Sequence, residues 1–356
     1  MADYLGMLKG EQLISLSENF DYVTATADFV GLKLFPAVKT NNMKLAIAQL
    51  TKGGKIPVMA LVHAFDTESR IEDRPNYETM NLELLLIKAK LNQGESIRKL
   101  RNDLGMPETE RNILRVIFDD ANNLISRILT RVEAMCNETL CTGKVVIDEN
   151  GYKTTVDYNV PSENILSVAD WDNPDHDIFA DLMAVKRASK DKITDMLIND
   201  VVMGYILNNK AFKQITASYT PIQFLTEDFA KSYILGTFGI KITVNPLTYK
   251  KDALDTTEYK FVPDNRIAFF ASKRNADGST APIGNTFFTS TPDEDYGIAS
   301  QTSGFVAVTQ YQTADPAGVW TKASAVALPC PSDPATLYPC TITKTPAQGA
   351  GGDSGS

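Results

Sequence analysis

The chain has 356 residues, of which 44 are acidic and 35 are basic, so its net charge is −9. Because recognition of nucleic acid through its phosphates needs a basic surface, this charge argues against sequence-specific binding of DNA or RNA. The chain has no apolar run of about 18 residues, as a membrane-spanning helix would need, and its first residues lack the pattern of an export signal, so we expect no membrane partner and no export.

Few residues are available for metal binding or acid–base catalysis. The only histidines are His63 and His176, which leaves little scope for either chemistry. The cysteines lack the short paired spacing of a zinc site, and we expect them to be free thiols. They are Cys136, Cys141, Cys330 and Cys340. The sequence therefore predicts no catalytic residue, no metal site and no cofactor.

The first part of the chain predicts short helices and then a long two-stranded loop. The helices are expected at EQLISL (11–16) and NMKLAIAQL (42–50). An apolar, strand-like run at 55–65 and a second apolar run from Met80, which periodicity assigns to neither helix nor strand, enclose a tip of alternating charge. These charges form either a solvated turn, the more common case, or a contact with a neighbouring subunit. They are Asp66, Glu68, Arg70, Glu72, Asp73 and Arg74.

A long amphipathic helix is predicted over about 107–142. Apolar residues recur at steps of three and four on one face, and polar residues occupy the other. The apolar residues are Ile113, Ile117, Ala121, Leu124, Ile128, Val132 and Met135; the polar ones are Asp119, Asn122, Ser126, Thr130, Glu133 and Asn137. Gly143 is placed to end the helix. Directly after it, Asn150-Gly151 predicts a two-residue hairpin turn.

The second half of the chain alternates helices and strands. Asp175 or Asp177 is expected to cap a helix whose buried face carries Ile178, Leu182 and Val185. Further elements are predicted as helices around 199–208 and 222–234, and as strands at 240–244, 260–270 and 304–313. The Gly/Ser-rich end, 346–356, is predicted to be a disordered tail.

The order of these elements resembles that of the major capsid proteins of tailed phages, specifically the lambda-type family (major capsid protein E). The resemblance covers about residues 50–345. It rests on five stretches in order: TGKVVIDENGYKTTVDY, WDNPDHDIFADL, LNNKAFKQI, GIKITV and FVPDNRIAFF.

This resemblance implies an α+β architecture, the Hong Kong 97-type capsid fold. Its parts are an N-terminal arm, an extended β-hairpin loop, a peripheral domain with a long spine helix, and an axial domain. The expected ranges are 1–50 for the arm, 51–92 for the extended loop, 93–170 and 300–322 for the peripheral domain, 171–299 and 323–345 for the axial domain, and 346–356 for the tail.

The resemblance also implies a structural role. The chain would self-assemble, as hexamers and pentamers, into the icosahedral head that encloses the DNA genome of a tailed bacteriophage. Portal and scaffold proteins would be partners, as would a decoration protein where one is present, and assembly would take place in the host bacterial cytoplasm. Two alternatives remain open: an encapsulin-like compartment shell of the same fold, and a cytosolic hydrolase that uses paired carboxylates.

Overall fold

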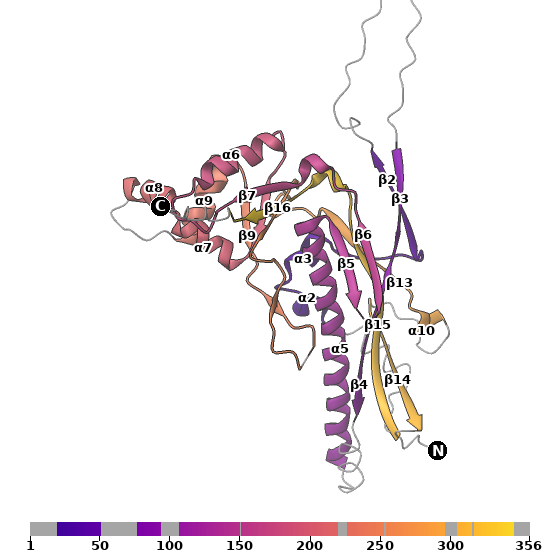
Figure 1. Cartoon of the computed structure of the whole chain (residues 1–356). Coiled ribbons are helices and arrows are strands. Elements are labelled where there is room, and N and C mark those ends of the chain that lie inside the picture. The colour runs from indigo at the N-terminus through magenta and orange to yellow at the C-terminus, as the bar shows by residue number, and fades with distance from the viewer. Residues whose placement is uncertain are drawn as a thin grey trace, which may run out of the picture.

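The structure, a computed structural model, describes residues 20–50, 77–93, 107–149, 151–219, 226–252, 254–295, 305–314 and 317–344. Figure 1 shows two units side by side. One is elongated, with a long helix lying along a sheet, and the other is a rounded group of helices around a smaller sheet. There are two hydrophobic cores: one lies within the rounded unit, and the other lies along the long helix and also includes Leu197, Ala268 and Phe270 from the sheet of the rounded unit.

The elongated unit is built on helix α5 (Pro107–Thr142) and strand β15 (Ala317–Pro331). At 1.5 Å per residue, the 36 residues of α5 make a rod of about 54 Å. Strand β15 pairs with three strands and packs against α5. Along one side it pairs with β14 (Ala307–Ala314) and then β13 (Gly284–Thr289), and along the other with β4 (Leu85–Gln93). Strand β1 (Ala37–Lys39) completes the sheet beside β13.

The rounded unit contains a five-stranded sheet of order β7-β16-β12-β8-β9. Helices cover it, and their apolar faces form the second core. The strands are β7 (Leu166–Ala169), β8 (Asp195–Ile198), β9 (Lys241–Val244), β12 (Arg266–Phe270) and β16 (Leu337–Thr343). The helices are α6 (Ile178–Ala188), α7 (Asp200–Asn208), α8 (Lys210–Tyr219) and α9 (Glu227–Phe238).

The remaining elements are short and flank the two units. Three antiparallel pairs are β2 (Lys44–Leu50) with β3 (Tyr77–Glu83), β5 (Lys144–Glu149) with β6 (Tyr152–Asp157), and β10 (Thr248–Tyr249) with β11 (Tyr259–Lys260). The short helices are α2 (Tyr22–Ala25), α3 (Val30–Leu34) and α10 (Pro292–Asp295), with 3-10 turns at Ser162–Asn164 and Pro334–Thr336.

The predicted long helix and hairpin are confirmed. The apolar residues of α5 from Ala121 onwards are buried as its spacing requires. Gly143 ends α5 with a φ of +71°, and Gly151 lies at +77° in the turn between β5 and β6. Asp177, one of the two expected caps, accepts a hydrogen bond from the backbone N–H of Ala180 at the start of α6.

Two expectations need correction, and one assignment that the sequence left open is resolved. Residues 44–50 of the predicted helix 42–50 form strand β2, because pairing with β3 gives this short apolar segment hydrogen bonds that its sequence does not specify. The run from Met80, which the sequence left open between helix and strand, is strand: it forms the end of β3 (Tyr77–Glu83) and most of β4 (Leu85–Gln93). On α5, Glu133 and Asn137 belong to the predicted polar face, yet both are fully buried. The predicted helix 11–16 and the strand-like run 55–65 lie outside the described residues.

Sheet pairing also differs from the expected domain ranges. Strand β13, expected in the axial domain, pairs with β15 in the elongated unit, and β15 itself continues through the expected boundary at 322/323. Strand β4, expected in the extended loop, pairs with β15 from Leu85 onwards. Such long-range strand pairing is not recorded in any local pattern of the sequence.

Candidate functional site

The predicted subunit-interface residues lie outside the described residues, but the foot of their loop is described. Strands β2 and β3 form a ribbon that rises from the elongated unit (Figure 1). At its foot, Leu82, Leu84 and Leu85 are buried in the core, and the backbone N–H of Leu84 donates to the carbonyl of Met43 at 3.1 Å. The loop is therefore joined to the core of the elongated unit by apolar contacts.

A buried carboxylate on α5 holds the N-terminal segment in place. Helix α3 has no side-chain cap of its own at Phe29. Instead, Glu133 accepts hydrogen bonds from the backbone N–H groups of Gly31 and Leu32, each at 2.8 Å. The first N–H groups of a helix lack partners within the helix, and the helix dipole favours a negative charge there. Glu133 thus supplies the missing cap from a residue about 100 positions away.

The environment of Glu133 combines burial with several donors. Burial raises the pKa of its carboxyl group, while hydrogen bonds from Gly31, Asn137 and Leu32 act in the opposite direction. The side-chain amide of Asn137 donates to Glu133 at 2.6 Å, and its oxygen accepts from Asn245, just beyond β9, at 3.4 Å. One short stretch of α5 therefore joins the N-terminal segment to the rounded unit.

The approach of α3 to α5 depends on a glycine. A Cβ atom at Gly31 would lie 2.6 Å from the Cβ of Cys136 and 2.8 Å from the Oε2 of Glu133. Separations this short do not occur between real side chains, so only glycine fits without movement of α5 or α3.

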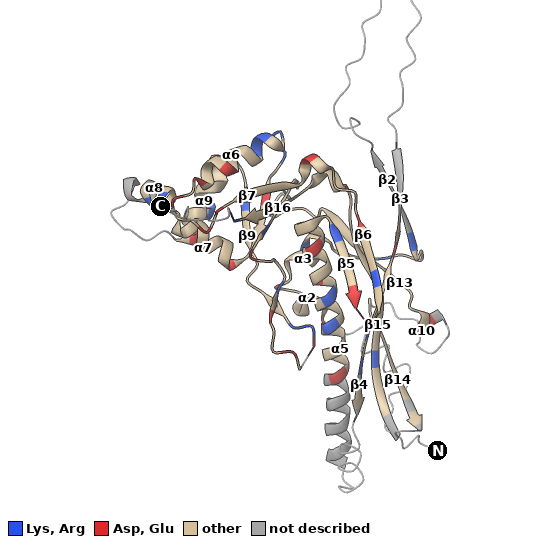
Figure 2. Ribbon diagram, viewed as in Figure 1, with Lys and Arg blue, Asp and Glu red and all other residues tan. Residues whose placement is uncertain are grey.

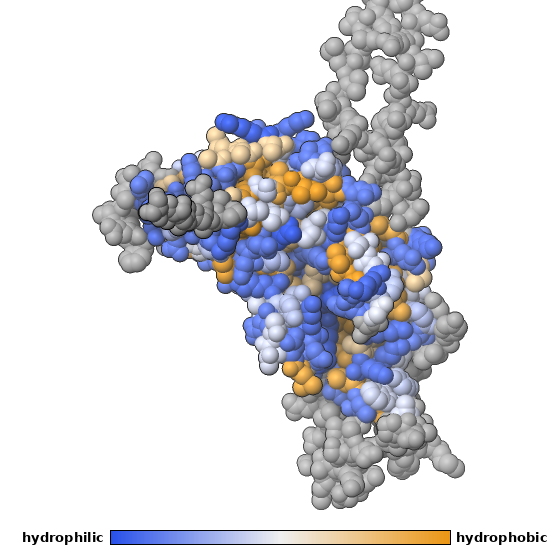
Figure 3. Space-filling view, in the orientation of Figure 1, coloured by the Kyte–Doolittle hydropathy of each residue, from blue (hydrophilic) through white to orange (hydrophobic). Residues whose placement is uncertain are grey.

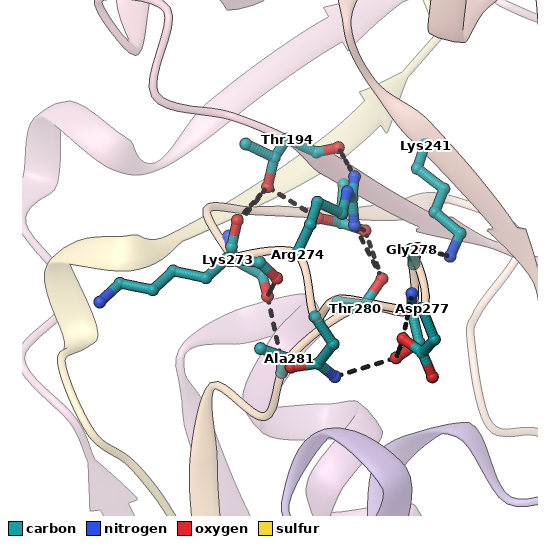
Figure 4. Close-up of polar contacts among 12 residues, drawn as sticks. Thr194, Lys241, Lys273, Arg274, Asp277, Gly278, Thr280 and Ala281 are labelled. Carbon is teal, nitrogen blue, oxygen red and sulfur yellow. Dashed lines mark hydrogen bonds and ion pairs between the residues drawn. The ribbon is translucent and has the colours of Figure 1, made fainter.

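A second polar cluster lies where the chain crosses between the two units (Figure 4). The carboxylate of Asp195, which is 1% exposed, accepts hydrogen bonds from Arg274 at 2.7 Å and from the hydroxyl groups of Thr194 and Thr280. Arg274 also donates to the backbone oxygen of Thr194 at 2.8 Å. These bonds hold the segment between β12 and β13 against the start of β8. The hydrogen bonds of Asp195 and Arg274 thus fix the position in which the chain passes from one unit to the other.

The cysteine side chains are used for packing. All four cysteines are free and buried, as the sequence predicts. Burial raises the pKa of Cys141, Cys330 and Cys340 to about 12, which keeps these thiols neutral and unreactive. His176 shares the carboxylate of Asp181 with the indole N–H of Trp171, at 2.8 and 2.7 Å. His63 lies outside the described residues.

The described part of the chain has neither a metal-binding cluster nor a membrane-spanning helix. No three His, Cys, Asp or Glu side chains there are grouped so that they could hold a metal ion. No helix there is both long and apolar enough to cross a membrane.

Comparison with protein families gives a match over nearly the whole chain. The family model described as phage major capsid protein E matches residues 15–342. A sequence comparison with curated proteins finds no match.

Two solved structures share the fold. The first is a prophage protein from E. coli CFT073, described as a capsid protein, with a TM-score of 0.61 and 14% identity over 95% of this chain and 99% of that chain. The second is a phage-related protein from Bordetella bronchiseptica RB50, with a TM-score of 0.52 and 12% identity over 94% of this chain and 96% of that chain. At such identities the likeness concerns the fold.

Proposed function

Because the chain belongs to the phage major capsid protein E family, we propose that it builds a phage head as hexamers and pentamers of one repeated subunit. The protein is a major capsid protein with the Hong Kong 97-type fold, and its place is the capsid of the virion. The observation that carries the proposal is the family match over residues 15–342, because it includes the ribbon, the long helix and both sheets.

The shape of the subunit supports a tile rather than a compact enzyme. Helix α5 and strand β15 run along the elongated unit, and the ribbon β2–β3 projects from it (Figure 1). A projecting ribbon leaves surface that a second copy can cover. We propose that the loop beyond β2 and β3 reaches over the adjacent subunit.

We also propose domain ranges refined by strand pairing. The peripheral domain would include β4, α5, β5, β6, β13, β14 and β15, and the axial domain would include α6 to α9 with β7, β8, β9, β12 and β16. On this proposal the long strand β15 belongs entirely to the peripheral domain, and the polar cluster at Asp195 and Arg274 joins the two.

The finer parts of the function follow as proposals from the family. The chain would act without catalytic activity, assemble in the cytoplasm of the host bacterium, and cooperate with portal and scaffold proteins, and with a decoration protein where one is present. A shell subunit has to keep a defined shape. The polar clusters around Glu133 and Asp195 hold parts of this subunit in fixed relative positions.

Electron microscopy of the purified protein, with light scattering for mass, tests the proposal. Shells, tubes or rings of five and six subunits are the expected result. A monomer that stays monodisperse at every concentration, and also with the scaffold protein present, would overturn it in favour of a compact enzyme such as a hydrolase. Shells that enclose a protein cargo instead of a genome would favour the encapsulin-like alternative.

A further inference from the structure

One loop of the subunit ends in an unusually exposed apolar residue. Leu254 lies between β10 and β11 and is 92% exposed, whereas the next most exposed large apolar side chain among the described residues, Tyr152, is 58% exposed. A single exposed apolar residue needs no explanation by itself. The hydrogen bonds, ring stacking and charges of the loop around Leu254 are what suggest a contact with another molecule.

Two side chains of the loop hydrogen-bond to its backbone on either side of Leu254. Asp252 accepts a hydrogen bond from the backbone N–H of Leu254 at 3.3 Å, and Asp255 accepts one from Thr257 at 2.9 Å. At the base of the loop Tyr249 and Tyr259 stack with ring centroids 5.8 Å apart. Leu254 is thus presented on a preformed turn, which reduces the entropy lost on binding.

The stack at the base continues into the body of the subunit. Tyr249 lies 4.9 Å from the ring of Phe261, and Phe261 lies 5.9 Å from the ring of Phe29, beside α3. The side-chain amine of Lys251 lies 4.7 Å from the ring centre of Tyr259. The loop is therefore attached to the N-terminal segment. Its charged residues are Lys250, Lys251, Asp252, Asp255 and Glu258, so it carries one net negative charge, and its three acids lie on both sides of Leu254.

The exposed face of α6 has complementary properties. Met183 is 48% exposed there, and Ala180, Ala184 and Ala188 continue the apolar face at helical spacing. Basic side chains follow at the end of the helix and in the turn beyond it, namely Arg187, Lys190 and Lys192, while Asp191 in the same turn pairs with Lys186 at 3.6 Å. In the part of the chain that the structure describes, neither these three bases nor the three acids of the loop form an ion pair.

The two surfaces lie on opposite sides of the subunit. Figure 2 shows the basic end of α6 along the top of the rounded unit, and both basic and acidic residues on the loop that hangs below it beside α5. In Figure 3 a pale apolar area lies at the same upper rim, with hydrophilic atoms beside it. The ribbon β2–β3, which rises from the elongated unit, points toward the same upper side of the subunit on which α6 lies (Figure 1).

We propose that the Leu254 loop of one subunit docks on the exposed face of α6 of the next subunit around the capsomer. The apolar tip then covers Met183, and the acids of the loop meet Arg187, Lys190 and Lys192. Because the two surfaces face opposite ways, the contact is head to tail, and such a contact closes into a ring when its rotation allows. The partner is a second copy of this chain, so the inference rests on the proposed function.

A cysteine pair tests this contact directly. The variant Met183→Cys/Leu254→Cys is assembled, oxidised and run on a denaturing gel without reductant. Disulfide-linked species are expected to form a ladder that ends at a closed ring of five or six subunits. The single variants have one of the two sites each and should give dimers at most. The variant Met183→Cys/Leu235→Cys pairs α6 with an exposed residue of α9, and it should give no ladder.

A charge exchange provides the second measurement. Arg187→Glu and Glu258→Lys are each expected to lower the yield of assembled particles at least tenfold at low salt, and the double variant should recover it. If wild-type shells form, yet the ladder is absent and both charge variants assemble normally, the contact is wrong while the shell function stands. If the wild type forms no shell under any condition, both proposals fail together.

Discussion

Glu133 on the long helix and Gly31 in the N-terminal segment are joined by a hydrogen bond of 2.8 Å across 102 positions of sequence. The Glu133 carboxylate accepts from a backbone N–H that has no partner within its own helix. The close approach of α3 to α5 requires a residue without a Cβ at position 31. The two residues therefore depend on each other, and both can be tested.

Removal of the carboxylate should destabilise the subunit. In Glu133→Ala the N–H groups of Gly31 and Leu32 lose their partner inside the protein, which costs about 2–4 kcal/mol of unfolding free energy for two unsatisfied donors. Denaturant unfolding of the unassembled subunit measures the change. Thr130→Ala, on the exposed side of the same helix, should change the stability by less than about 0.5 kcal/mol. Equal stability of the two variants would contradict the assigned role of Glu133.

The stability of the wild type should also respond to pH through Glu133. Its pKa is raised above the ordinary 4.5 because burial disfavours the charged form. A raised pKa in the folded state means that the contribution is fully present below pH 4.5 and is lost as the pH rises through the folded value. Unfolding free energies measured from pH 4 upwards should therefore fall more steeply for the wild type than for Glu133→Gln. Parallel curves would show that Glu133 has no shifted pKa.

Two glycine substitutions should have opposite effects. Gly31→Ala forces a Cβ against Cys136 and Glu133, and overpacking of this kind costs about 1–3 kcal/mol. Gly204→Ala lies within helix α7, where a Cβ would meet no atom within 4 Å, so it should stabilise the subunit by up to about 1 kcal/mol. Thermal unfolding of both variants checks the sign as well as the size. Destabilisation by Gly204→Ala, or none by Gly31→Ala, would refute the assigned packing.

The ion pair at the crossing between the units should matter more than a surface pair. Arg274→Ala leaves the buried carboxylate of Asp195 with hydroxyl partners only, and we expect a loss of about 2–4 kcal/mol, reduced from the fully buried case because Arg274 is itself 32% exposed. Lys153→Ala removes a pair in which both side chains are exposed, and should cost less than about 1 kcal/mol. Chemical denaturation of the two variants at the same pH shows which one loses more unfolding free energy.

The charged tip of the extended loop should be needed for assembly. Arg70→Glu/Arg74→Glu reverses two charges that we propose to meet a neighbouring subunit. The double variant should remain folded by circular dichroism and fail to form shells in electron microscopy. Normal shells from this variant would remove the loop charges from the interface. The conservative variant Arg70→Lys/Arg74→Lys keeps the charge and should assemble.

Local patterns in the sequence were sufficient for the elements that a local rule controls. The spacing from Ala121 to Met135 predicted which face of α5 is buried, and Gly143 and Gly151 have the positive φ that their turns require. The same reasoning was wrong for Glu133, because a polar residue at helical spacing normally faces water. No local signal reports that a second helix arrives there with free N–H groups.

By itself, the sequence determined the long helix, the hairpin, the free thiols and, through the order of its motifs, the capsid family. Only the tertiary structure decided that 44–50 is a strand, that β15 pairs with three strands, and that Glu133 and Asp195 are buried. The physical reason is the range of the interactions. Helix periodicity and turn chemistry act between residues a few positions apart, whereas strand pairing and buried polar contacts join residues that meet only after the chain has folded.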